Sequence, residues 1–149
     1  MMKKYRLLTA FLLFFPLLFG KSNTPRLYSL TVKVEGLRNS DGVVQFALYN
    51  KDGSLPDEKF KSWYRIGTSE IENNRAFYIF TDLPKGDYAV NILHDENRNG
   101  KIDKGLILPK EGIGFSNYQK IGLSNKPRFS KASFPLETDR TIYIKIIYL

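Results

Sequence analysis

Residues 80–93 read Phe-Thr-Asp-Leu-Pro-Lys-Gly-Asp-Tyr-Ala-Val-Asn-Ile-Leu, and they give the clearest indication of architecture in the chain. Pro84 holds its backbone φ near the value that a tight turn needs, and the glycine two residues later adds conformational freedom. Beyond this turn, Tyr88, Val90 and Ile92 occupy alternate positions, so a strand would place all three on one face. The segment therefore predicts a strand, a sharp corner and a second strand that contributes to a β-sheet core.

This corner resembles the F-x-x-L-P-x-G-x-Y-x-V segment of transthyretin-like and collagen-adhesin-type sandwich domains. The resemblance implies that the ring of Tyr88 packs in the core. It also implies that the Tyr88 hydroxyl hydrogen-bonds nearby backbone, as in the tyrosine corner of related sandwiches. The role of this tyrosine would be structural.

Further strands are expected on both sides of the corner, because short β-rich or alternating runs are separated by turn residues. These runs cover residues 29–35, 43–49, 63–71, 76–81 and 141–148. Residues 29–49 are expected to form a hairpin, whereas residues 95–130 lack periodicity and are expected to form a long irregular loop before the last strands. No amphipathic helix is apparent. The sequence thus predicts an all-β fold, a single immunoglobulin-like or transthyretin-like β-sandwich of about seven strands.

Residues 1–22 are expected to be a signal peptide, because a basic start precedes an uncharged, largely apolar run at 7–19. This run is shorter than the ~20 apolar residues of a membrane-spanning helix, so no permanent span is expected once it is removed. Cleavage is expected after Ser22, with Gly20 as the alternative. Residues 23–149 would then form one domain in the periplasm or outside the cell.

The composition limits the kinds of site and partner. The chain has no cysteine, so it forms neither disulfides nor thiolate metal sites. Its formal net charge is +8, and the loss of Lys3, Lys4, Arg6 and Lys21 with the signal peptide leaves 8 − 4 = +4. The remaining charge is expected on an ordinary solvated surface rather than in a patch for anionic lipid or glycan, and nucleic acid is not an expected partner.

Residues 94–103, His-Asp-Glu-Asn-Arg-Asn-Gly-Lys-Ile-Asp, have the spacing of a calcium-binding loop. In the pattern D-x-[DN]-x-[DN]-G, alternate side chains send oxygen atoms to one point and the glycine permits a sharp reversal. The residues at the liganding positions are Asp95, Asn97, Asn99, Lys101 through its backbone carbonyl, and Asp103. Calcium is expected rather than magnesium, because magnesium prefers strict octahedral geometry with several retained waters.

The loop is not an EF-hand, because Leu106 stands where an EF-hand has a bidentate glutamate and no flanking helices are predicted. An ion would complete its coordination with Glu111, Glu96 or water. The alternative is an ordinary polar turn, in which the Asn and Asp side chains bond their own backbone. Glu111 has the corresponding alternative role of accepting hydrogen bonds from backbone amides.

A wider resemblance appears when the motifs are taken in order. L-x-V-x-V-x-G-L-R-N at 30–39, the corner at 80–90, the loop at 94–103, P-K-E-G-I-G-F-S-N at 109–117 and the final strand resemble an uncharacterised family of exported bacterial proteins, domain of unknown function 2141. The resemblance implies export and a β-sandwich. It brings no established activity, substrate or catalytic residue.

Catalysis is not expected. His94 is the only histidine, and the chain has neither a thiol nucleophile nor a G-x-S-x-G elbow. A carboxylate-based hydrolase built from Asp95, Asp103 or Glu111 is the catalytic alternative. These same carboxylates are better explained as cation ligands, so no catalytic residue is assigned.

The expected function is therefore that of a calcium-stabilised, non-catalytic binding or structural module of the cell envelope. Its partner would be an envelope protein or a glycan, and the sequence does not specify an oligomeric state. The alternative is a carbohydrate- or envelope-polymer-binding domain, in which Trp63, Tyr64 and Tyr118 would offer exposed stacking faces. Exposed rings at Trp63 and Tyr64 would favour glycan binding, and buried rings would favour a structural role.

Overall fold

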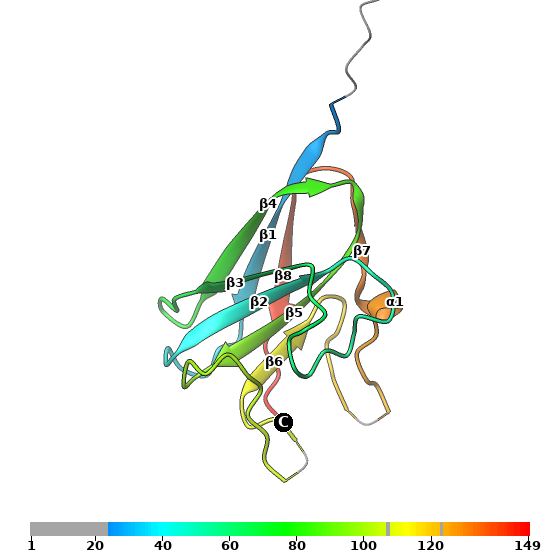
Figure 1. Ribbon diagram of the computed structural model, residues 1–149. Coiled ribbons are helices and arrows are strands. Elements are labelled where there is room, and N and C mark those ends of the chain that lie inside the picture. Colours follow the sequence, from blue (N-terminus) through cyan, green and yellow to red (C-terminus); the bar gives the residue numbers. More distant parts are fainter. Residues whose placement is uncertain (1–23, 107, 123) are drawn as a thin grey trace, which may run out of the picture.

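The computed structural model describes residues 24–149 except residues 107 and 123 (Figure 1). The signal peptide expected at residues 1–22 lies outside the described residues. No helix in the described part is long and apolar enough to cross a membrane. In chain order the elements are β1 (Leu27–Glu35), β2 (Val43–Tyr49), β3 (Arg65–Ser69), β4 (Ala76–Pro84), β5 (Gly86–Asp95), β6 (Gly112–Phe115), α1 (Phe129–Ala132), β7 (Phe134–Leu136) and β8 (Arg140–Lys145).

The described residues form eight strands in two sheets, one more strand than the approximate number expected, and the predicted all-β sandwich is confirmed. The three-stranded sheet has the order β4-β1-β8, in which β1 pairs antiparallel with β4 and parallel with β8. The five-stranded sheet has the order β3-β2-β5-β6, and β7 pairs with the first residues of β5. In the view of Figure 1, β2 and β5 pass in front of β1 and β8.

Alternate residues of the central strands fill the space between the two sheets. Completely buried examples are Leu30 and Val32 on β1, Phe46 and Leu48 on β2, and Val90 and Ile92 on β5. Phe46 also stacks on Tyr78 of β4, with ring centroids 5.6 Å apart. The period-two pattern of the sequence therefore corresponds to the inward faces of both sheets.

The corner at residues 80–93 is confirmed. β4 ends at Pro84 and β5 begins at Gly86, so the chain passes between the two sheets within one intervening residue. Tyr88 is buried, and its hydroxyl donates a hydrogen bond to the Pro84 carbonyl oxygen at 2.9 Å. This bond has the form that the resemblance to sandwich domains implied.

The hairpin predicted at residues 29–49 is wrong. β1 and β2 lie in different sheets, since β1 pairs with β4 and β8 whereas β2 pairs with β3 and β5. The chain between them contains Gly36 and Gly42, whose φ values of 80° and 70° lie in the left-handed region that favours glycine. Turn residues between two strands indicate a reversal, but a reversal can also carry the chain from one sheet to the other.

The region 95–130, expected to be irregular, contains β6 and the start of α1. β6 is the sequence Gly-Ile-Gly-Phe, too short and too rich in glycine to show a period. An added Cβ at Gly114 would lie 2.9 Å from the side chains of Ile144 and Ile92. Glycine is therefore needed here because the end of the chain passes close to the strand.

A second apolar layer covers the outer face of the five-stranded sheet. It consists of Ala47, Tyr49, Ala89, Leu93, Ile113 and Phe115 from the strands and of Leu55, Phe60, Tyr118, Phe129 and Ala132 from the segments that cover them. Because the sheet is covered on both faces, all seven residues of β2 are buried. This second apolar layer lies next to the loop and the pocket that are described below.

Candidate metal-binding loop

The predicted loop begins where β5 ends. Asp95, the last residue of β5, is buried, and its two carboxylate oxygens accept hydrogen bonds from the backbone N–H groups of Asn99 at 3.0 Å and Gly100 at 2.7 Å. Arg98 and Gly100 have φ values of 62° and 71°, so both bend the chain back toward Asp95. The first, fifth and sixth positions of the predicted loop are thus drawn together.

The side chains of Asn97, Asn99 and Asp103 also converge. The Asn97 Nδ2 group donates to Asp103 Oδ2 at 2.6 Å, and the Asn99 Nδ2 group lies 3.1 Å from both Asp103 oxygens. The two amide oxygens accept from loop backbone, Asn97 Oδ1 from Asn99 N–H at 3.1 Å and Asn99 Oδ1 from Lys101 N–H at 2.8 Å. The loop is therefore one compact group of oxygen-bearing side chains.

Glu111, the residue just before β6, joins the two ends of this loop. It is buried, and its two oxygens accept hydrogen bonds from the backbone N–H groups of Glu96 and Asp103, each at 3.0 Å. Burial raises the pKa of the Glu111 carboxyl, the two backbone hydrogen bonds oppose the rise, and the nearby charges of Asp103 and Asp95 add to it. The repulsion among these three carboxylates is one that a bound cation would relieve.

In the described structure, the polar groups of the loop hydrogen-bond to one another. No three His, Cys, Asp or Glu side chains in the described part of the chain are grouped as a metal ion requires. The oxygens of Asp95 and Glu111 face backbone N–H groups, and those of Asp103 face two amide nitrogens. Rotation of the Asn97 and Asn99 amides would turn oxygen in place of nitrogen toward Asp103. Calcium binding by the six predicted residues stays a prediction.

Glu96, the other expected ligand candidate, is engaged elsewhere. Its carboxylate forms an ion pair with Arg38 and accepts a hydrogen bond from Asn39 Nδ2 at 2.8 Å. The Arg38 guanidinium holds the pKa of the Glu96 carboxyl below its usual range. This link between the loop and the chain that follows β1 is not predictable from the sequence, because no local signal pairs two residues so far apart.

A comparison with known protein families covers these same strands and loops. A family model described as an uncharacterized protein conserved in bacteria (DUF2141) matches residues 32–143. The chain belongs to this family. The match extends from β1 into β8 and includes the corner, the loop and β6, so the expected resemblance is confirmed. No curated protein and no solved structure matches the chain.

The single histidine of this DUF2141 domain is enclosed within the fold. His94 has no exposed surface, and its Nε2 atom lies 2.9 Å from the Asp41 carbonyl oxygen, which can only accept a hydrogen bond. Nε2 therefore donates to this oxygen, and Nδ1 shares a hydrogen bond with the Tyr148 hydroxyl at 2.6 Å. These contacts join β5 to two other segments of the DUF2141 domain.

The three aromatic residues expected on the surface differ in exposure. Trp63 is 42% exposed and Tyr64 is 37% exposed, and both line a shallow groove beside β3 and β4. Tyr118 is only 3% exposed, and its hydroxyl accepts from Arg128 N–H at 3.0 Å. The expectation that Tyr118 offers a stacking face is therefore wrong, because its ring belongs to the second apolar layer of the DUF2141 domain.

Proposed function

We propose that this DUF2141 domain is an exported, calcium-stabilised, non-catalytic binding or structural module of the cell envelope. The observation that supports the proposal is the convergence of Asp95, Asn97, Asn99 and Asp103 in a loop whose two ends are joined by Glu111. These residues, with the carbonyl of Lys101, offer the carboxylate, amide and carbonyl oxygens that calcium prefers. The ion would neutralise carboxylates that repel one another and would replace the amide contacts to Asp103.

We also propose that the domain is not an enzyme. The enclosed ring of His94 supports it, because both ring nitrogens are already hydrogen-bonded within the fold. The buried carboxylates of Asp95 and Glu111 support it in the same way, because each serves two backbone N–H groups. A hydrolase would need one of these groups to reach a substrate, and all three are buried.

Calcium is expected to raise the melting temperature of chelator-treated mature domain by several degrees, whereas magnesium is expected to have little effect. At a calcium concentration about 100 times the dissociation constant, binding to the native state adds about 2.7 kcal/mol. A contribution of this size shifts the midpoint by several degrees in a domain of this length. The measurement is a thermal melt followed by circular dichroism, with calcium in the millimolar range.

Asp103→Asn should abolish this rise, because it removes a carboxylate and retains the shape of the side chain. Arg98→Lys should retain the rise, because Arg98 is exposed and its guanidinium pairs with Glu70 outside the loop. A calcium-dependent rise that survives in Asp103→Asn would contradict the site, and equal melting temperatures with and without millimolar calcium would contradict calcium binding altogether.

Glycan binding is the second candidate, and the exposed rings of Trp63 and Tyr64 favour it. Because Trp63 is the only tryptophan, its fluorescence reports directly on the groove. Titration with a soluble oligosaccharide such as chitohexaose is expected to change this emission saturably, since sugar rings stack on aromatic faces. Tyr64→Ala should weaken the response at least threefold, and Tyr143→Ala, on β8 outside the groove, should not. Unchanged emission at millimolar oligosaccharide would count against a glycan site in this groove.

A further inference from the structure

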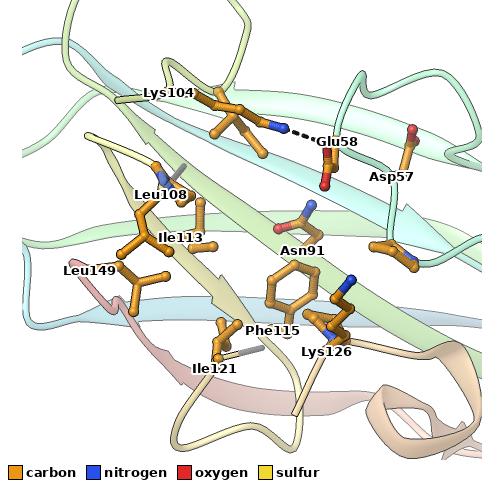
Figure 2. A pocket seen from close by; sticks show the side chains of 15 residues that line it. Asp57, Glu58, Asn91, Lys104, Leu108, Ile113, Phe115, Ile121, Lys126 and Leu149 are labelled. Carbon is orange, nitrogen blue, oxygen red and sulfur yellow. Dashed lines mark hydrogen bonds and ion pairs between the residues drawn. The ribbon is translucent and has the colours of Figure 1, made fainter. Parts of the chain in front are cut away.

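A small apolar pocket lies over the outer face of the five-stranded sheet, bordered by Ile102 and Lys104 at the end of the loop proposed to bind calcium. Its volume is about 160 Å³, and its apolar lining comes chiefly from Leu108, Ile113, Phe115, Ile121 and Leu149. Figure 2 shows these side chains on one side of Asn91, with Asp57 and Glu58 on the other. The pocket therefore has an apolar wall, and Asn91 lies between that wall and the acidic side.

The side chain of Asn91 is the unusual feature of this pocket. Asn91 lies in the middle of β5 on the face that carries Ala89 and Leu93, and it is only 1% exposed. Among the residues that the structure describes, its Oδ1 atom has no hydrogen-bond partner. Buried polar atoms in native proteins are nearly always paired with protein or water, so this acceptor marks the point in the pocket wall where a hydrogen-bond donor would bind.

Of the four charged residues that line the pocket, Asp57, Glu58 and Lys104 have partners within the fold, whereas Lys126 is exposed to solvent. Asp57 is buried, and its carboxylate accepts hydrogen bonds from the backbone of Lys61 and Ser62 and from the hydroxyl of Tyr49. Glu58 forms an ion pair with Lys104, which reaches it from the opposite loop. The interior thus offers a ligand apolar contact and one amide oxygen, and this combination selects a neutral molecule.

We infer that this pocket binds a small neutral molecule with an apolar body of one ring and a single hydroxyl group, such as an alkylphenol. The volume fits this class, since an engineered protein cavity of about 150 Å³ with an apolar lining holds benzene. The apolar body would lie against Ile113, Phe115 and Ile121, and the hydroxyl would donate a hydrogen bond to Asn91 Oδ1. This inference does not rest on calcium binding, because neither Asn91 nor the apolar wall supplies a proposed calcium ligand.

The test compares 4-ethylphenol with ethylbenzene, which has the same shape without the hydroxyl. Methyl NMR of the mature domain is expected to show saturable shifts for Ile113 and Ile121 with 4-ethylphenol, and at least tenfold weaker binding of ethylbenzene. The difference is expected because a site with a buried acceptor discriminates against an analogue that leaves the acceptor unpaired. An absence of saturable shifts with 4-ethylphenol, or equal affinity for the two compounds, would overturn the inference.

Two variants separate the role of Asn91 from mere accessibility of the apolar wall. Asn91→Leu should remain folded in a thermal melt and should lose the preference for the hydroxyl, so that ethylbenzene binds at least as tightly as 4-ethylphenol. Ile121→Trp should fill the pocket and abolish binding of both compounds. Phe77→Ala, a change of a 57% exposed side chain on the other sheet, should leave both affinities unchanged. A hydroxyl preference that persists in folded Asn91→Leu would overturn the assignment to Asn91.

Discussion

Gly42→Ala is expected to lower the free energy of unfolding by about 2–5 kcal/mol, through backbone strain and overpacking together. Gly42 has a φ of 70°, and a Cβ at this position would lie 1.9 Å from the carbonyl oxygen of Asp95 and 2.6 Å from the Cα of Glu96. These atoms are backbone, so they cannot move aside by a rotation of a side chain. The substitution should therefore displace the start of the 95–103 loop, and urea unfolding of residues 23–149 measures the loss.

Gly53→Ala is the matched control. Gly53 has a similar φ of 76°, but nothing lies within 4 Å of the added Cβ. Only the conformational cost of about 1–2 kcal/mol should remain. If the two substitutions lower stability equally, the close contact between Gly42 and the start of the loop is not the cause, and the packing described at this point is wrong.

Much of the fold is predictable because local patterns determine individual strands. Alternation predicted β1, and the run from Val43 to Tyr49 predicted β2 with the observed bounds. The resemblance of the corner to sandwich domains implied that the Tyr88 hydroxyl bonds nearby backbone, and its acceptor, the Pro84 carbonyl oxygen, is only four residues away. In each of these cases the determining contacts are close together in the sequence.

Strand pairing was not predictable in the same way. The mistaken hairpin and the missed strand β6 have one cause, since both depend on contacts between distant segments. β1 pairs in parallel with β8, more than a hundred residues later, and β6 is joined to the end of the chain by hydrogen bonds between Ile113 and Ile147. The surroundings of Asn91 were not predictable either. The sequence shows a polar residue within a strand, but it does not show which distant segments cover that residue.

The candidate site was also predictable only in part. Spacing predicted that Asp95, Asn97, Asn99 and Asp103 share one loop, and the described loop does bring them together. Spacing does not determine which way each oxygen points, because the same side chains can serve an ion or their own backbone. The distinction between these two roles is energetic, so substitution of the residue that joins the ends of the loop is the informative experiment.

Glu111→Ala is expected to lower the free energy of unfolding by about 2–6 kcal/mol, since two backbone N–H groups lose their acceptor at about 1–3 kcal/mol each. The two groups belong to Glu96 and Asp103. Glu111→Gln retains one side-chain oxygen and should lose about half as much. Urea unfolding of wild type and both variants, with chelator present, gives the three values.

The pH dependence of the difference between wild type and Glu111→Gln tests the electrostatic part. The folded pKa of Glu111 is raised, so the contribution of this carboxyl is fully present below its unfolded pKa and is lost as pH rises through the folded value. Without calcium, the stability advantage of wild type over Glu111→Gln should therefore shrink between acidic and neutral pH. The Arg38–Glu96 pair is present in both proteins, so its own pH dependence cancels in this difference. Excess calcium should restore the advantage at neutral pH, because a cation relieves the repulsion from Asp95 and Asp103; if calcium leaves the difference unchanged, Glu111 joins the ends of the loop without contributing to an ion site.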